Sequence, residues 1–510
     1  MSTRPPFHVA LRPSAPSRRD RALQECLAGA RALQAGLTDA GLARYRAAVA
    51  LTPNDAEVAA LHGVALRSAA RLADAQRELI RAIALDGQRA DSFTQLAQAY
   101  RMTGDTDQAA QAFLAAAMLQ TTDATAWRDA AESLRLAGRI GDGLAAARHA
   151  ATLAPGDPSI ANTTALLLHR DGHIDAALAL CDRVRASAPE DLNLALTHAM
   201  LLRTVGRHDE GWTLYERRLE LPTFRQRPHT PNSPRWTGGD LTGRHILVRA
   251  EQGLGDQVQF VRWACFLRAV GAGTVTVQVA QPLIRLLKTA PGIDAVVAAD
   301  RPPPPHQLHV DLLSLPHLMR TGGHMQSHLV PYLSAPGAPP ACARRLPAPA
   351  RGTIRIGLVW AGTPLHADDR TRSMPLTALL PALDQPSVKV IVLQQGPPRA
   401  ELELVPPALK RTVTDVVPEC VDMGETAHVM AECDVILTVD TAVAHVAGAM
   451  GLSTWLMVAH PAEWRWGRDR TASDYYPSMR IIRQQRSGDW SDVVCTVRQC
   501  ITEWLDRKDG

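Results

Sequence analysis

Small and large apolar positions recur along the first part of the chain with a period of 34 residues. Each period holds two stretches in which apolar residues stand three or four positions apart, which predicts a pair of amphipathic helices. A turn signal closes each pair, at Pro53, Gly87, Thr121, Pro155 and Pro189. Another separates the two helices of a pair, at Gly36, Ala70, Gly104, Gly138, Gly172 and Gly206. This pattern predicts a helical solenoid of six repeats over residues 22–221.

A small residue at the eighth position of each repeat predicts that the paired helices approach closely. These residues are Gly29, Gly63, Ala97, Ala131, Ala165 and Ala199. In its small, bulky and turn positions the pattern resembles the tetratricopeptide repeat. We expect a partner to bind the concave face, which the first helix of each repeat lines. Polar candidates there are Asn162, Thr163 and Asn193, although a merely solvated face has the same composition.

A proline-rich stretch follows the repeats, over residues 222–243. Because proline cannot continue a helix, this stretch is interpreted as a linker. It carries Phe224 and Trp236, which we expect to pack down and to fix the angle between the two halves of the chain.

From Arg244 the periodicity changes to short apolar strands that alternate with helical stretches, which predicts parallel sheets with crossover helices. The expected strands lie at 246–248, 275–279, 295–297, 354–360, 388–393, 435–439, 454–458 and 480–482. A second proline-rich break divides them into two Rossmann-like lobes, over residues 244–340 and 353–510. The predicted fold class is therefore α + α/β: a solenoid followed by two doubly wound lobes with a ligand cleft between their strand ends.

Composition and charge narrow the function only a little. The chain has 510 residues and a formal charge of +4, which gives no case for a nucleic acid polymer as its partner. The eight cysteines are scattered and have no metal-binding spacing, so we expect free thiols in a reducing compartment. The composition of residues 1–21 predicts a disordered lead-in, and we expect no secretory signal there. Apolar runs are too short to predict a membrane span. We therefore expect a cytoplasmic protein.

The first candidate motif is the loop Gly253-Leu254-Gly255-Asp256, between a strand and a helix. Glycines there allow the backbone to approach a ligand, and the helix N-terminus offers unpaired N–H groups. Asp256 has two possible roles, as a helix cap or as a general base that faces the cleft.

The second motif is Asp440-Thr441-Ala442-Val443-Ala444-His445, which follows a strand of the second lobe. Asp440 and Thr441 lie at a helix start, where N–H groups and a hydroxyl can hold a diphosphate. His445 lies one turn further on and could donate to a phosphate or sugar oxygen. The alternative for His445 is an interior histidine that is satisfied by the protein.

Two further loops of the second lobe are candidates for donor binding. Gly362 and Thr363 follow its first strand, and a charged stretch comes next, with His366, Asp368, Asp369, Arg370, Arg372 and Ser373. This stretch could clamp phosphate or could be a solvated loop. Gln394 ends the next strand, where it could read a base or a ribose. An aromatic segment with Trp464, Trp466, Tyr475 and Tyr476 either lines the cleft or wraps over the first lobe.

In order and position these motifs resemble those of the bacterial heptosyltransferase-like (family 9-like) glycosyltransferases, which have the GT-B fold. The whole chain resembles the bacterial tetratricopeptide-repeat proteins that carry such a domain. More distantly it resembles the O-linked N-acetylglucosamine transferases and the repeat-bearing flagellin glycosyltransferases. The resemblance implies a metal-independent transfer of a sugar from a nucleotide sugar, with no other cofactor. It also implies an acceptor protein, such as a flagellin, that the solenoid recruits.

Carried over to this sequence, the resemblance implies that Asp256 is the base for the acceptor hydroxyl. Thr363 with Arg370 or Arg372 would face the diphosphate, and Asp440, Thr441 and His445 would hold the donor. Two positions depart from the family pattern: Ala442 stands where glycine is usual, and the phosphate loop offers arginine instead of lysine. Two alternatives therefore stay open, a repeat adaptor that has lost catalysis and a transferase whose acceptor is a lipid-linked or polysaccharide glycan.

Overall fold

The computed structural model describes residues 16–225, 227, 231–319, 330–346, 350–364 and 369–509. Most of the expected lead-in, together with His366 and Asp368, lies outside these residues. The chain divides into two compact units, Met1–Leu167 and Leu168–Gly510, and each is described by itself.

The helical pairs follow the predicted period. From the second repeat on, the first helix of each pair begins at residue 56, 90, 124, 158 and 192, always 34 residues after the one before. The helices are α1 Arg18–Gln34, α2 Thr38–Leu51, α3 Ala56–Ser68, α4 Leu72–Leu85, α5 Ala90–Thr103, α6 Thr106–Leu119, α7 Ala124–Leu136, α8 Ile140–Leu153, α9 Pro158–Arg170, α10 Ile174–Ser187, α11 Leu192–Thr204 and α12 His208–Tyr215. The first unit holds α1 to α8 and most of α9, and the later helices belong to the second unit.

Local chemistry accounts for these helix boundaries. Asp55, Asp123 and Asp191 stand just before α3, α7 and α11, where each carboxylate accepts from N–H groups of the first turn. The predicted close approach is also present, since a Cβ at Gly63 would lie 2.6 Å from the Leu79 side chain. The solenoid-type repeat is thus confirmed in its period, its turns and its packing.

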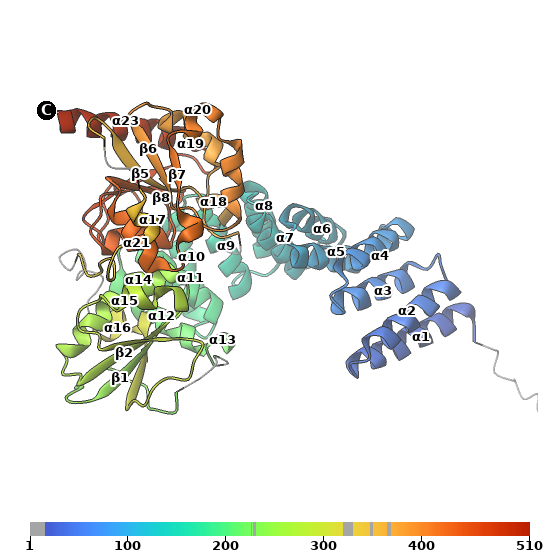
Figure 1. The fold of residues 1–510 in the computed structure, drawn as a ribbon. Coiled ribbons are helices and arrows are strands. Elements are labelled where there is room, and N and C mark those ends of the chain that lie inside the picture. Colours follow the sequence, from blue (N-terminus) through green and yellow to red (C-terminus); the bar gives the residue numbers. More distant parts are fainter. Residues whose placement is uncertain are drawn as a thin grey trace, which may run out of the picture. The chain divides into compact units, whose positions relative to one another are not determined.

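The first lobe, drawn in green and yellow in Figure 1, holds a parallel sheet in the order β3-β2-β1-β4. Its strands are β1 His245–Arg249, β2 Thr274–Val279, β3 Ala295–Ala298 and β4 Leu308–Asp311. Its helices and turns are α14 Leu254–Ala264, η2 Cys265–Arg268, η3 Gln281–Leu283, α15 Ile284–Leu287, η4 Leu312–Ser314, α16 Leu315–Leu318 and α17 Ala341–Arg344. Strand β4 was not predicted from the sequence.

The second lobe holds a six-stranded parallel sheet in the order β10-β9-β8-β5-β6-β7. Its strands are β5 Ile354–Val359, β6 Val388–Val392, β7 Val413–Asp415, β8 Val435–Val439, β9 Thr454–Val458 and β10 Met479–Arg483. Between and after them come α18 Asp369–Arg372, α19 Leu376–Leu383, η6 Pro397–Leu404, α20 Pro407–Lys410, η7 Val417–Glu419, α21 Met423–Ala431, α22 Ala442–Ala449, η8 Trp464–Trp466 and α23 Ser491–Asp509. This is the strand order of dinucleotide-binding folds, in which the order of strands along the sheet reverses between β5 and β8.

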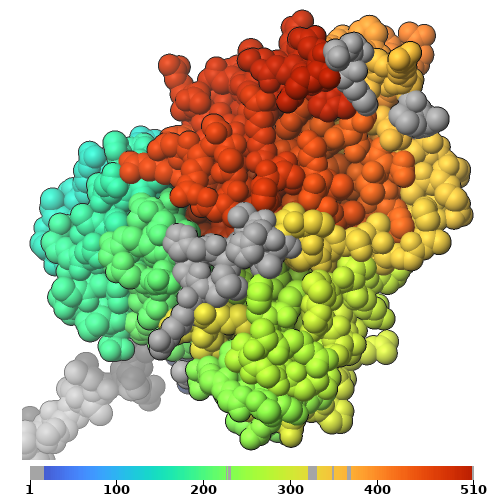
Figure 2. Space-filling view, turned by 90° about the vertical axis from the view of Figure 1, so that its left-hand side faces the viewer, coloured from blue at the N-terminus to red at the C-terminus, as the bar shows by residue number. Residues whose placement is uncertain are grey.

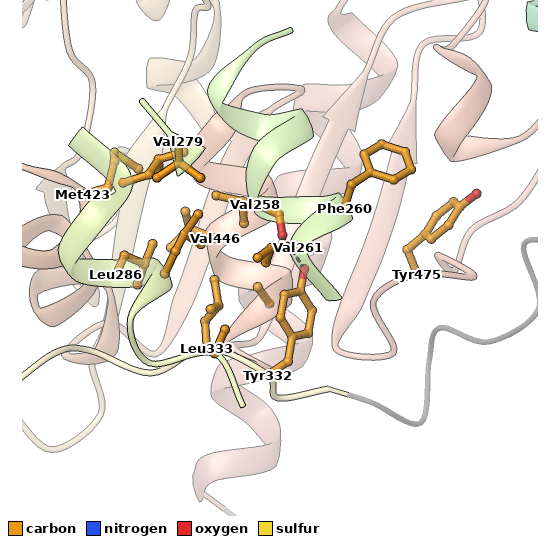
Figure 3. Close-up of a cluster of buried hydrophobic side chains, with 14 of the residues drawn as sticks. Val258, Phe260, Val261, Val279, Leu286, Tyr332, Leu333, Met423, Val446 and Tyr475 are labelled. Atoms are coloured by element: carbon orange, nitrogen blue, oxygen red, sulfur yellow. Dashed lines mark hydrogen bonds between the residues drawn. The ribbon is translucent and has the colours of Figure 1, made fainter. Parts of the chain in front are cut away.

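The two lobes share one hydrophobic core. Figure 3 shows Val258 and Phe260 of α14 in the same cluster as Met423, Val446 and Tyr475 of the second lobe. The aromatic segment around Trp464 and Tyr476 is buried in this cluster, so it packs over the first lobe.

The last repeat joins the same core. Trp212 of α12 and Trp236 of the linker are both buried in it. Two short helical segments, η1 Glu216–Glu220 and α13 Pro222–Arg225, lead from α12 into the linker. Figure 2 shows the two lobes from one side, with the second lobe in orange and red above the first.

Candidate active site

Strand order brings two of the predicted donor loops together. Strands β5 and β8 are direct neighbours, with Val359 paired to Thr438. The loop that carries Gly362 and Thr363 leaves the end of β5, and Asp440 and Thr441 follow the end of β8. Ligands of such sheets bind at the carboxyl ends of the strands, at the point where the strand order reverses. The second lobe therefore presents these residues at the position where a ligand is expected.

The loop of the first lobe is held by its own aspartate. Gly253 is the N-cap of α14, and Asp256 reaches back so that its Oδ2 accepts the Gly253 N–H at 2.9 Å. The predicted capping role of Asp256 is thus present in the structure. Its other oxygen, Oδ1, forms an ion pair with Arg465 of the second lobe. The base role of Asp256 stays a prediction.

The Gly253–Asp256 loop and the Asp440–His445 motif meet directly. A Cβ at Gly255 would lie 2.6 Å from Cδ2 of His445 and 3.6 Å from Cα of Ala442. A side chain at position 255 would therefore collide with the imidazole ring, and this contact needs glycine. The sequence motif of one lobe is packed against the start of α22 in the other.

Arg465 lies at the centre of this junction. Its guanidinium donates to Glu463 Oε1 at 2.7 Å and to Gln259 Oε1 at 2.5 Å, besides the pair with Asp256. Burial by itself lowers the pKa of Arg465, but Glu463, Asp256 and Asp440 together hold that pKa above its ordinary value. Carboxylates of both lobes thus converge on one cation, Arg465, which no sequence motif singles out.

His445 lies in a buried aromatic setting. Its Nδ1 is 2.9 Å from the Tyr476 hydroxyl, and its ring stacks on Trp466 with centroids 5.6 Å apart. Burial, with smaller contributions from Arg465 and Arg262, lowers the pKa of His445 well below its ordinary value. The imidazole is therefore neutral, and the geometry fits the interior alternative. Its role toward a donor stays a prediction.

The loop after β5 is ordered around Gly362. The Gly362 N–H donates to Ser373 Oγ at 2.8 Å, and that hydroxyl donates to Asp369 at 3.0 Å. Arg372 pairs with the same carboxylate at 3.3 Å. Thr363 and Arg370 are exposed at the loop surface. In this arrangement Arg372 braces its own loop, and Arg370 and Thr363 are the residues that face solvent.

Gln394 follows the end of β6, and its side chain bonds to the backbone there. Its side chain is buried, and its Oε1 accepts from the Trp360 and Ala361 N–H groups at 3.1 and 2.9 Å. Its Nε2 donates to the Ala361 and Gln395 carbonyls at 3.0 and 2.8 Å. The amide thus joins the ends of β5 and β6, and it could read a base or ribose only by giving up these bonds.

The described residues hold no group of three or more His, Cys, Asp and Glu side chains placed to bind a metal ion. Across the same ranges, no helix has both the length and the apolar character needed to cross a membrane.

Residues 377–454 match the model of glycosyltransferase family 9 (heptosyltransferase), a segment that contains Gln394, Asp440, Thr441 and His445. Protein FlbA of Caulobacter vibrioides is 24% identical over 328 residues, which are 58% of this chain and 52% of FlbA. The chain thus matches about half the length of that relative.

Solved structures match a part of the chain. MamA is 19% identical with a TM-score of 0.30, over 32% of this chain and 91% of MamA. PilF of Pseudomonas aeruginosa is 17% identical with a TM-score of 0.34, over 41% and 97% of the two chains. The chain combines tetratricopeptide-type repeats with a domain that is similar to glycosyltransferase family 9.

Proposed function

We propose that this domain is a metal-independent GT-B enzyme that transfers a sugar from a nucleotide sugar to a protein hydroxyl. One observation carries the proposal: the Gly253–Asp256 loop of one lobe is packed against the Asp440–His445 motif of the other. An acceptor-side carboxylate and a donor-side helix start therefore face a common centre. This arrangement suits a reaction that needs a base on one side and an anion site on the other.

The donor diphosphate would bind at the start of α22. The first N–H groups of a helix are unpaired and favour an anion. Thr441 is the N-cap of α22 and makes no capping bond through its side chain. Its hydroxyl lies 3.2 Å from the Thr438 hydroxyl and would exchange this partner for the ligand. The exposed Thr363 and Arg370, and the neighbouring Arg372, would approach the same diphosphate from the end of β5. These groups would stabilise the leaving nucleoside diphosphate.

In the proposed reaction the acceptor oxygen forms a bond to the anomeric carbon, and the bond from that carbon to the diphosphate oxygen breaks. Asp256 Oδ1 takes the proton of the acceptor hydroxyl. For this step the ion pair between Arg465 and Asp256 Oδ1 has to open. A bound diphosphate supplies a competing anion for Arg465, so donor binding would free the base. The order of events would then be donor first and acceptor second.

A catalytically inactive adaptor is the second candidate. It is supported by Asp256, whose two oxygens are both occupied, and by the four hydrogen bonds of Gln394. The acceptor could also be a lipid-linked or polysaccharide glycan. Mass spectrometry of cell proteins from a deletion strain separates that case. With a lipid-linked or polysaccharide acceptor, the glycans on protein would be unchanged, and the loss would appear in the lipid or polysaccharide.

The deciding experiment is a thermal-shift screen of the full chain against nucleotides and nucleotide sugars. A donor should raise the melting temperature of the wild type and of Asp256→Asn alike, because bound ligand stabilises the folded state. Asp440→Asn should reduce this shift. With the donor identified, Asp256→Asn should lower transfer by about 10² to 10⁴, the usual worth of a general base, and EDTA should leave transfer unchanged.

Two outcomes would contradict the proposal. If no nucleotide or nucleotide sugar shifts the melting temperature, the adaptor is the better account. If Asp256→Asn transfers at the wild-type rate, another group is the base.

A further inference from the structure

A buried arginine from the last repeat lies where the strand order of the first lobe reverses, between β1 and β4. Arg218 of η1 is 1% exposed. Its Nη2 donates to Glu251 Oε1 at 2.7 Å and to Ser314 Oγ at 2.9 Å, and its Nε donates to Glu251 Oε2 at 2.9 Å. Glu251 follows β1 and Ser314 follows β4, the two parallel strands between which the strand order reverses. The crevice that would hold a ligand in such a lobe is occupied by the protein itself.

Glu251 connects this arginine to the candidate site. It lies two residues before Gly253, and its Oε1 also accepts the Leu313 N–H at 2.9 Å. Glu216 of η1 accepts from Arg218 at 2.7 Å, and its other oxygen accepts from Arg235 at 2.8 Å. Both carboxylates and both guanidinium groups therefore have partners, and the start of the Gly253–Asp256 loop is tied to the repeat.

Gln252, which directly precedes the Gly253–Asp256 loop, also contacts the repeat. Gln252 has a φ of +62°, in the left-handed region that residues other than glycine rarely adopt. Its side-chain amide donates to the hydroxyl of Tyr215, the last residue of α12. A repeat side chain therefore holds the loop residue whose backbone is strained.

A third contact reaches the segment that carries Arg465, the ion-pair partner of Asp256. The Arg203 guanidinium of α11 lies 4.4 Å from the ring of Trp464, and 4.8 and 4.3 Å from the rings of Trp212 and Tyr215. Trp464 precedes Arg465, the partner of Asp256, and Arg465 stacks on it at 4.5 Å. One repeat thus contacts both loops that position the Asp256 carboxylate.

We propose that the sixth repeat, residues 192–220, is a built-in part of the catalytic centre, with Arg203, Tyr215 and Arg218 as positioning residues for Asp256. This inference rests on the proposed base role of Asp256. The sixth repeat would then differ in role from the others. The repeats toward the N-terminus would recruit the acceptor, and the sixth would position Asp256 for the transfer.

The test uses the full chain with Tyr215→Phe, Arg218→Gln and Arg218→Lys. Arg217→Gln is the matched control, because Arg217 is the neighbour of Arg218 in η1. Arg217 pairs with Glu220 at 2.9 Å and donates to the Pro189 carbonyl at 2.6 Å, both outside the lobes. Hydrogen–deuterium exchange of the peptide covering 249–257 is measured first, with a peptide of α19 as the internal reference, because α19 packs in a separate cluster of the second lobe.

We expect faster exchange of 249–257 in Tyr215→Phe and Arg218→Gln, a smaller increase in Arg218→Lys, and none in Arg217→Gln. With a donor in hand, kcat should fall about tenfold to a hundredfold in the first two, since small misplacements of a reacting group cost this much. KM for the donor should stay unchanged, because the donor motif lies on the other lobe.

Unchanged exchange in Tyr215→Phe overturns the inference even if Arg218→Gln fails to fold. A rise in the donor KM with kcat unchanged also overturns it. If the wild type transfers no sugar at all, the proposed function fails, while the exchange measurement still decides whether the repeat holds the loop.

Discussion

The family pattern has a lysine in the phosphate loop, and the chain as a whole gives a reason for its absence. Only four of the 55 basic residues are lysine: Lys288, Lys389, Lys410 and Lys508. The arginine of the phosphate loop therefore follows a preference that runs through the sequence. Arginine also serves the interior, where Arg262 donates to the Tyr332 hydroxyl at 3.0 Å and to the Tyr475 carbonyl at 2.9 Å. The missing lysine is weak support for a loss of catalysis.

A single buried histidine predicts a pH dependence of stability. Burial, with Arg170 and His460 nearby, lowers the pKa of His169 from 6.5 to about 4. Its Nε2 has no hydrogen-bond partner in the part of the chain that the structure describes. The unfolded chain therefore binds a proton below pH 6.5 that the folded chain accepts only near pH 4. Stability is lost as the pH falls through this window.

The measurement compares the wild type with His169→Asn by urea denaturation at pH 7 and pH 5. The wild type should lose about 2 kcal/mol more of its free energy of unfolding than the variant does over this interval. Other histidines with lowered pKa values, such as His62 and His445, contribute to both proteins and cancel in the comparison. Equal losses in the two proteins would remove His169 as a source of acid sensitivity.

At the scale of the element, one turn differs from its five counterparts. The turns between paired helices have φ near +80° at Gly36, Gly104, Gly138, Gly172 and Gly206, but the second repeat has Ala70 there, with φ +57°. A left-handed conformation costs an alanine about 1 to 2 kcal/mol. Ala70→Gly should therefore stabilise the first unit by about 1 kcal/mol.

The control is Ala47→Gly, on the exposed side of α2. Glycine inside a helix should destabilise the same unit by about 1 kcal/mol. Denaturation of the full chain, followed by helical circular dichroism, measures both changes. Destabilisation in both variants would show that the turn at Ala70 carries no strain.

Elements with a strong period could be predicted from the sequence, and short edge elements could not. The six helical pairs were predicted because turn residues such as Gly104 repeat every 34 residues, each for the same steric reason. Strands β4 and β7 were missed because they are brief and partly polar, as in Leu308-His309-Val310-Asp311, and they lie at sheet edges. Their pairing depends on neighbours far away in the chain.

The candidate site shows the same division. The motifs at Gly253–Asp256 and Asp440–His445 could be placed at strand ends, since regular elements fix where strands end. Arg465 could not, because it lies 209 residues from Asp256 in an irregular segment. The four backbone bonds of the Gln394 amide are a local detail that the sequence does not show, and the role of Gln394 as a ligand contact stays a prediction.

At the scale of the whole molecule, the repeat period offers a direct test of recruitment. Deletion of residues 56–89 removes α3 and α4, which make up one period, and leaves α2 followed by α5. Because each repeat of a solenoid contacts mainly its neighbours, the shortened solenoid should still fold. The second unit, which holds both lobes, is not altered by this deletion.

The shortened chain should bind a donor as the wild type does, and it should transfer sugar to a short acceptor peptide at an unchanged rate. Transfer to the intact acceptor protein should fall, because an extended concave surface gives its affinity through many small contacts, and one repeat of that surface is gone. Competing rates for peptide and intact protein, measured in one reaction, give the ratio without any correction for enzyme concentration. If this ratio is the same in both chains, the N-terminal repeats do not recruit the acceptor. The part of the solenoid that matters for transfer would then be the sixth repeat alone, through its hold on the loop of Asp256.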